Sequence, residues 1–277
     1  MDDNKEQAII ITGATGSIGR ELAKALSTTG RLIILAVRNT AKGESVAQKI
    51  MAVNVQARVM VRHLDLSDTE SVKIFAEGII ASGVSLYGLI NNAGVMNRDY
   101  SVTPQGLEAT MGVNLINTAL LTQLLIPYII DGGHVVFMTS LTRKLYNSRS
   151  INIDVDASHF SQLGTYGRSK TALTHYALHL SRKYPHLNIN CADPGVVNSD
   201  MVTMKRWYDG LANIIFRPFI RSPRKGAKAV LRAMTLSAGG FVASVGKVSA
   251  IGYNPESMVH KNIVEAVSNK ITQLIAS

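Results

Sequence analysis

Residues 7–12, Gln-Ala-Ile-Ile-Ile-Thr, run directly into Gly13-Ala14-Thr15-Gly16-Ser17-Ile18-Gly19. The apolar run predicts a buried β-strand, and the segment that begins at Ser17 predicts a helix. Glycines between such elements let the backbone approach a pyrophosphate, which the N–H groups and dipole of the helix attract. A tight turn without a ligand is the alternative, and the position after a first strand favours the dinucleotide. The expected contacts are Gly13, Thr15, Gly16, Ser17, Ile18 and Gly19.

Apolar runs of strand length alternate with segments of helical period along most of the chain. The expected strands lie at 7–12, 32–37, 57–63, 86–91, 133–140 and 187–192. The expected helices lie at 17–28, 40–53, 68–81, 104–109, 112–130 and 164–184. Beyond residue 196 we expect helices at 201–219, 223–234 and 255–275, and one short strand within 239–252. This order predicts an α/β fold of the Rossmann type, a doubly wound parallel sheet with helices on both faces.

Length and composition suit one globular domain. The chain has 277 residues, of which 46% are hydrophobic and 17% are charged. We expect a single dinucleotide-binding and catalytic domain over 1–277, with a substrate lid at 196–222. The single cysteine, Cys191, lies in an apolar run and is interpreted as a small core residue. The polar start of the chain and its short apolar runs predict a cytoplasmic protein without a membrane span.

The charge balance is basic, with 29 Lys and Arg against 19 Asp and Glu, a net charge of +10. The basic residues are dispersed and no basic run is interleaved with aromatic residues, so we expect no nucleic-acid partner. A cluster at Arg217, Arg221, Arg224 and Lys225 beside an apolar segment makes contact with an anionic membrane the less favoured alternative. No metal site is expected, because His175 and His179 share a helix face without a third ligand.

The second expected strand ends at Val37-Arg38-Asn39, with no carboxylate at its tip. An acidic residue at this place accepts the 2′-hydroxyl of NAD, whereas an arginine favours the 2′-phosphate of NADP. Arg20 and Lys42 add positive charge nearby. Arg38 and Asn39 therefore predict NADP(H) as the cofactor, and a solvated surface arginine is the alternative.

The third and fourth strands end in residues that suit the adenosine half of the cofactor. Asp65, followed by Leu66, is placed to accept a hydrogen bond from the adenine amino group, since Ser67 or Asp68 fits a helix cap better. After the fourth strand, small residues let the cofactor lie against the backbone, and asparagine amides can hold the loop. These residues are Asn92, Ala93 and Gly94.

Tyr166 and Lys170 are separated by one helical turn and therefore share a helix face. The reference pKa of a tyrosine is about 10, and a nearby ammonium favours the phenolate and lowers that pKa. Tyr166 then serves as an acid in one direction and a base in the other, and an ordinary helical Tyr/Lys pair without a catalytic role is the alternative. Ser140 ends the fifth expected strand, at the sheet edge where ligands gather. Asn114, a poor helix former inside a helix, is a candidate to hold a proton-relay water.

Together these segments resemble the short-chain dehydrogenase/reductase superfamily over nearly the whole chain. The shared features are the Thr-Gly-x-x-Gly-x-x-Gly at 12–19, Asn-Asn-Ala-Gly at 91–94, Asn114, Ser140, Tyr166-x-x-x-Lys170 and Pro194-Gly195. Within the superfamily, the chain resembles the retinol-dehydrogenase-like branch at 35–43, 194–199, 222–227 and the closing helix.

The resemblance implies a catalytic tetrad of Asn114, Ser140, Tyr166 and Lys170. Tyr166 would exchange the proton, Ser140 would orient the carbonyl, and Lys170 would also bind the nicotinamide ribose. The segment after the sixth strand would cover the nicotinamide through Pro194, Gly195, Val197 and Ser199.

The chain departs from the family pattern in three places. Family members more often have glycine at the position of Ser17 and serine at that of Thr139, so we expect a slightly altered turn that still binds the cofactor. Tyr166 follows Ser140 by 26 residues, a long spacing that fits the retinol-dehydrogenase-like branch. That branch often carries a membrane-anchoring N-terminal segment, which is not expected in this sequence.

The resulting hypothesis is an NADP(H)-dependent enzyme that transfers a hydride between the nicotinamide and an alcohol/carbonyl pair. Aromatic residues of the expected lid, Trp207, Tyr208, Phe216 and Phe219, favour a hydrophobic small-molecule substrate. A catalytically silent NADP(H)-binding regulator is the alternative, and a nucleotide-sugar epimerase or dehydratase is a third. The resemblance also implies a homo-oligomer.

Overall fold

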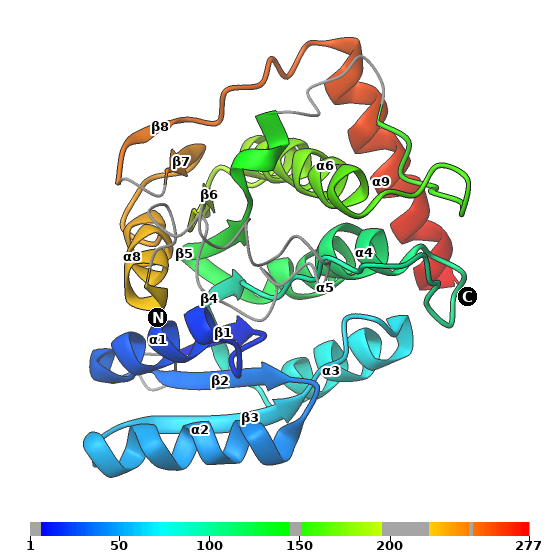
Figure 1. The fold of residues 1–277 in the computed structure, drawn as a ribbon. Helices are drawn as coiled ribbons and strands as arrows, with labels where there is room; N and C mark the ends of the chain where they lie inside the picture. Colours follow the sequence, from blue (N-terminus) through cyan, green and yellow to red (C-terminus); the bar gives the residue numbers. More distant parts are fainter. Residues whose placement is uncertain (1–6, 145–150, 196–221, 244–245, 277) are drawn as a thin grey trace.

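The computed structural model describes residues 7–144, 151–195, 222–243 and 246–276 (Figure 1). The strands are β1 (Gln7–Thr12), β2 (Leu32–Val37), β3 (Arg58–His63), β4 (Ser85–Asn91), β5 (Ile129–Met138), β6 (Asn188–Ala192), β7 (Gly240–Val242) and β8 (Val248–Ala250). They form one sheet in the order β3-β2-β1-β4-β5-β6-β7-β8, in which only the β7–β8 pair is antiparallel. The strand order reverses direction between β1 and β4, which is the switch point expected of a doubly wound sheet.

Helices cover both faces of the sheet, as Figure 1 shows. The α-helices are α1 (Ser17–Leu26), α2 (Thr40–Val53), α3 (Thr69–Ala81), α4 (Ala109–Met111), α5 (Asn117–Leu125), α6 (Gln162–Lys183), α8 (Pro223–Ala233) and α9 (Met258–Ala276). Short 3-10 or π turns are η1 (Ser27–Thr29), η2 (Gly112–Ile116), η3 (Ile126–Tyr128) and η4 (Leu141–Lys144). The expected fold class is therefore confirmed.

Alternate residues of each central strand feed two separate hydrophobic cores. In β1, Ile9 and Ile11 pack with residues of α1, α2 and α8, whereas Ala8 and Ile10 pack with α3, α5, α6 and α9. All four side chains are at most 1% exposed. A strand buried on both faces must be apolar at every position, which is why the strands read as continuous apolar runs.

Polar caps set the start of three helices. Asn39 accepts a hydrogen bond from the N–H of Lys42 and caps α2. Asp68 caps α3 by accepting from Glu70 N–H, and Ser222 caps α8, whose first residue is Pro223. These residue types satisfy backbone N–H groups that have no partner within the helix.

Four sequence predictions were wrong in detail. The helix expected at 104–109 is a turn, because Gly106 has a φ of 76° and Val102 pairs with Glu108 as an isolated bridge. The helix expected at 112–130 begins as the π turn η2 and ends at η3. β5 therefore starts at Ile129, earlier than residue 133. Two strands, not one, lie within 239–252.

The expectation that no apolar segment is long enough to span a membrane also needs correction. The helical stretch Ala109–Tyr128 reaches that length and composition. In the fold, 83% of its most apolar window is buried. Packing in the protein core accounts for the apolar character of this stretch, so its composition carries no conclusion about a membrane.

Candidate active site

Parallel pairing brings the ends of β1 to β6 to one edge of the sheet. The predicted site residues follow these strand ends or lie on the helices beside them. The sequence therefore places both halves of the candidate site, the glycine turn and the Tyr166–Lys170 pair, along the same edge.

The glycine turn has the geometry needed to receive a phosphate. Gly13 adopts a φ of 63°, and its N–H donates to Ala36 O at 2.9 Å. A Cβ at Gly19 would lie 2.5 Å from Gly13 O, so only glycine lets α1 start against the turn. The N-cap of α1 is Gly16, which offers no side-chain cap, and the first turn holds no acidic residue. The N–H groups and the dipole at this helix start are thus available to an anion, which fits the predicted dinucleotide.

The loop after β4 packs against the glycine turn and is hydrogen-bonded to it. Asn92 Nδ2 donates to Thr12 O at 2.8 Å, and Ala93 N–H donates to Thr12 Oγ1 at 2.9 Å. A Cβ on Gly13 would lie 3.0 Å from Ala93. The expected role of the asparagine amide in holding this loop agrees with these contacts.

The tip of β2 carries an exposed arginine, Arg38. The neighbouring Asn39 has its side-chain oxygen engaged in capping α2. Arg20 lies closer to the glycine turn, since its Nη1 donates to Thr15 O at 2.8 Å. Arg38 thus presents an exposed guanidinium where the sequence predicts the 2′-phosphate, and Arg20 adds positive charge at the glycine turn.

Asp65 and Leu66 follow β3. Asp65 Oδ1 accepts hydrogen bonds from Ser67 N–H at 2.9 Å and Ser67 Oγ at 2.6 Å. Leu66 is buried, and its carbonyl accepts from Asn117 Nδ2 at 2.9 Å. The helix cap is Asp68, as the sequence favoured, so the Asp65 carboxylate does not cap α3.

Asn114 lies in the π turn η2, completely buried. Its Oδ1 accepts from Val95 N–H at 2.8 Å, and its Nδ2 donates to Val95 O at 2.8 Å and Ser169 Oγ at 3.1 Å. Both amide hydrogens are thus engaged, so the side chain ties η2 to the β4 loop and to α6. π turns inside helices are frequent at functional sites.

Lys170 is 3% exposed and its Nζ donates to Met138 O at 3.0 Å. A Cβ on Gly94 would lie 3.3 Å from Lys170 Nζ and 3.3 Å from Asn114 Oδ1. A side chain at position 94 would therefore crowd both the ammonium and the amide oxygen, which explains why glycine fits there. Burial lowers the pKa of the Lys170 ammonium to about 8.

Tyr166 lies near the start of α6, with Lys170 Nζ 5.9 Å from the centroid of its ring. Burial raises the pKa of the Tyr166 phenol to about 12, a hydrogen bond with Ser140 opposes that rise, and the charge of Asp193 adds to it. Burial thus raises the pKa of Tyr166, whereas the sequence analysis expected the Lys170 ammonium to lower it. Tyr166 is held in its neutral, proton-donating form.

Ser140 lies two residues beyond the end of β5. Its Oγ accepts hydrogen bonds from Thr142 N–H at 3.3 Å and Thr142 Oγ1 at 3.1 Å. Together with its hydrogen bond to Tyr166, these contacts fix the hydroxyl at the same sheet edge. The structure therefore brings Ser140, Tyr166, Lys170 and Asn114 into one region. Ser169 of α6 links Asn114 to that helix.

Asp193 was missed by the sequence reasoning. It is 1% exposed, directly precedes Pro194, and its Oδ1 accepts from Gly195 N–H at 2.8 Å. Gly195 has a φ of 75°. An acidic residue just before a Pro-Gly turn at a strand end was the available signal. Val197, Ser199 and nearly all of the expected lid lie outside the described residues.

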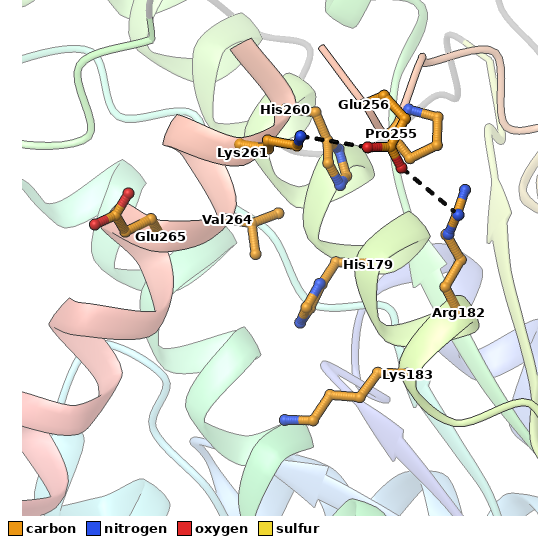
Figure 2. A pocket seen from close by; sticks show the side chains of 9 residues that line it. All are labelled: His179, Arg182, Lys183, Pro255, Glu256, His260, Lys261, Val264 and Glu265. Carbon is orange, nitrogen blue, oxygen red and sulfur yellow. Dashed lines mark ion pairs between the residues drawn. The ribbon is translucent and has the colours of Figure 1, made fainter. Parts of the chain in front are cut away.

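A pocket of about 470 Å³ lies on the groove between α6 and α9, away from this region (Figure 2). Tyr166 and Lys170 do not line it. Its lining residues are His179, Arg182, Lys183, Pro255, Glu256, His260, Lys261, Val264 and Glu265. Within the described ranges, no group of three or more His, Cys, Asp or Glu side chains is placed to hold a metal ion.

Comparison with known proteins gives consistent relatives. The family described as short chain dehydrogenase matches residues 7–208. Retinol dehydrogenase 11 of Homo sapiens is 35% identical over 232 residues, which cover 81% of this chain and 71% of that protein. Polyprenol dehydrogenase of Mus musculus is 33% identical over 236 residues, covering 81% and 70%.

Solved structures share the fold. An uncharacterized protein from Mycobacterium paratuberculosis superposes with a TM-score of 0.73 at 28% identity, covering 99% of this chain and 96% of that one. A short chain dehydrogenase from Burkholderia cenocepacia, solved in complex with NADP, superposes with a TM-score of 0.65 at 22% identity, covering 83% and 90%.

Proposed function

Because the chain belongs to the short chain dehydrogenase family, whose members are oxidoreductases that bind NAD(P), we propose that it transfers a hydride between NADP(H) and an alcohol/carbonyl pair of a hydrophobic substrate. The observation that carries this proposal is the common location of two groups of residues. An uncapped, glycine-built helix start lies on the same sheet edge as Asn114, Ser140, Tyr166 and Lys170, of which Asn114 and Lys170 are buried and Ser140 and Tyr166 are partly exposed.

The cofactor supplies the hydride, and the chain supplies the proton and the orientation. In the reducing direction, Ser140 Oγ donates a hydrogen bond to the carbonyl oxygen and Tyr166 donates its phenolic proton to that oxygen. A phenol with a pKa of about 12 holds this proton until negative charge develops on the oxygen. Lys170, buried beside Gly94, binds the nicotinamide ribose and passes a proton toward Tyr166. We assign to Asn114 the water that completes that relay, as the family resemblance implies.

The preference for NADP(H) over NAD(H) rests on charge at the tip of β2. Arg38 is exposed there, and no acidic residue adjoins it in the sequence. Arg20, fixed against Thr15 O, adds a second cation. Two guanidinium groups match the geometry and charge of a phosphate, and a ribose hydroxyl gains little from them.

A hydrophobic alcohol, aldehyde or ketone is the proposed substrate class. The aromatic residues of the lid support this class, as do the names of the relatives, retinol dehydrogenase and polyprenol dehydrogenase. The proton exchange by Tyr166 suits transfer of a hydride from a CH–OH carbon in the oxidising direction and to a carbonyl carbon in the reducing direction. A cytoplasmic location and a homo-oligomer remain predictions. Of the basic cluster considered for membrane contact, Arg217 and Arg221 lie outside the described residues.

The proposal is tested by following the oxidation of NADPH and of NADH with a panel of aliphatic, aromatic and isoprenoid aldehydes and ketones. We expect turnover on apolar carbonyls, with kcat/KM for NADPH at least about tenfold above that for NADH. Equal efficiency with both cofactors contradicts the NADP preference. Tight NADPH binding without turnover on any carbonyl class contradicts the enzymatic proposal and favours the regulator.

A further inference from the structure

Arg143 is a buried cation that the proposed chemistry does not use. It lies in η4, three residues after Ser140, and is 9% exposed. Among the described residues, no carboxylate lies within ion-pair distance of its guanidinium. Its Nε is buried without a hydrogen-bond partner in that part of the chain. Burying a charge in this way is costly, so the position calls for a compensating interaction.

Aromatic rings provide that interaction. The guanidinium carbon lies 4.1 Å from the centroid of the Phe241 ring in β7 and 5.9 Å from that of Tyr253. The Tyr253 ring in turn stacks on His175 of α6, with centroids 3.8 Å apart and planes 8° from parallel. An arginine favours such positions because its planar, weakly hydrated cation is attracted to the face of a ring. The Arg143 side chain is therefore anchored to β7 and, through Tyr253, to α6.

The backbone of Arg143 is attached on both sides to the candidate active site. Its N–H donates to Ser140 O at 3.1 Å, and its carbonyl accepts from Thr171 Oγ1 at 3.1 Å. Thr171 directly follows Lys170 on α6. A shift of Arg143 thus moves the carbonyl of Ser140 and the contact between η4 and the helix that carries Tyr166 and Lys170.

We propose that Arg143 is a positioning residue, which fixes the Ser140 turn by anchoring its guanidinium against the Phe241 and Tyr253 rings. The anchor acts through Ser140, so its catalytic consequence rests on the proposed function. The placement of the turn by Arg143 does not depend on the proposed function, and it can be measured without any substrate. A displacement of about 1 Å in a catalytic group is enough to lower turnover by roughly 10²-fold.

The test compares Arg143→Met, which keeps the length and removes the charge, with Arg143→Lys, Tyr253→Leu and Tyr253→Phe. Hydrogen exchange of the peptide covering residues 139–144 reports the turn. We expect exchange at least about tenfold faster in Arg143→Met and Tyr253→Leu. Tyr253→Phe should show a smaller increase, because its ring remains while the hydroxyl that interacts with Arg143 is lost. Arg143→Lys falls between, since lysine keeps the charge and loses the planar stack. Arg232→Met, at an exposed arginine on α8, is the control and leaves the exchange unchanged.

Kinetics separate positioning from general stability. For Arg143→Met we expect kcat to fall by about 10- to 100-fold while the Kd for NADPH changes less than about twofold. Unaltered exchange and kcat in folded Arg143→Met protein overturn the inference. If Arg143→Met does not fold, Tyr253→Leu decides, and wild-type exchange in that variant overturns it equally. A wild-type enzyme inactive on every carbonyl contradicts the proposed function alone, because the exchange measurement still tests the anchor.

Discussion

The glycine turn and the Ser140–Tyr166–Lys170 region lie along one sheet edge, yet they are built in opposite ways. The turn is made of backbone, and its function depends on side chains that are absent at Gly13 and Gly19. The catalytic region is made of buried or partly buried side chains, each tied to main chain or to another side chain, as in the bond from Lys170 Nζ to Met138 O.

This difference predicts opposite sensitivities. Adding atoms should damage the turn, because its contacts are already at van der Waals distance. Removing atoms should damage the catalytic region, because each lost group leaves a buried partner unsatisfied.

The largest effect is expected from one added methyl group in the turn. In Gly19→Ala, the new Cβ meets Gly13 O at 2.5 Å and Ala14 Cα at 2.7 Å, so the start of α1 must shift. We expect NADPH binding, measured by fluorescence, to weaken by roughly 10²-fold or more. The matched control is Gly78→Ala in α3, where a Cβ meets nothing within 4 Å. That variant should bind normally and gain about 0.5–1 kcal/mol in unfolding free energy. Equal binding by both variants contradicts the contrast.

In the catalytic region, the charge of Lys170 should set an alkaline limb. Burial holds the pKa of its ammonium at about 8, below the value of 10.5 for an exposed lysine, so the charge is present below pH 8 and lost above it. The plot of log kcat/KM for NADPH, which reports groups of the free enzyme, should be flat up to pH 7.5 and fall above about 8. Lys170→Met should lower the rate and abolish this limb. A limb at the same pH in the variant assigns it to another group.

Arg38 provides a case intermediate between the glycine turn and the catalytic region, because it is an exposed side chain beside a site built from backbone. Arg38→Ala should weaken NADPH binding by about 10- to 30-fold, the loss of one charge-assisted contact, and leave NADH binding unchanged. Lys49→Ala, which removes an exposed cation from the far end of α2, is the matched control. Parallel losses for NADPH and NADH in Arg38→Ala would show that the arginine does not read the phosphate.

The last prediction concerns stability rather than binding. His175 Nδ1 lies 3.1 Å from His260 Nδ1, and burial together with the charge of His260 lowers the pKa of His175 to about 4. The unfolded chain therefore binds more protons than the fold between pH 6.5 and 4, and stability is lost as the pH falls through that range. The shift corresponds to roughly 3 kcal/mol. Denaturant unfolding at pH 7 and pH 4.5 should show a smaller difference in His175→Gln, and an unchanged difference assigns the loss to other groups.

Local sequence determined the first half of the fold closely. β1, β2 and α2 have the predicted bounds, because apolar runs buried on both faces and an asparagine cap are visible within a few residues. The glycine turn was recognisable for the same reason, since its geometry depends on residues that are adjacent in the chain.

Features set by contacts across the chain were not predictable in this way. The π turn at Asn114 is held by hydrogen bonds to Val95 and Ser169, the latter 55 residues away. The sequence paired His175 only with His179 on the same helix face, whereas its partner in the structure, His260, lies 85 residues along the chain. The pKa of Tyr166 was expected to follow Lys170, but burial dominates and raises it, and burial is not visible in a helical spacing.

In the proposed mechanism, Tyr166 donates and accepts the proton while the cofactor transfers the hydride. Single-turnover oxidation of bound NADPH by an apolar carbonyl, in wild type and Tyr166→Phe, measures that step directly. Removing only the hydroxyl should slow the step by about 10²- to 10⁴-fold and change the Kd for NADPH by less than about twofold. A Tyr166→Phe rate equal to that of wild type would contradict the account.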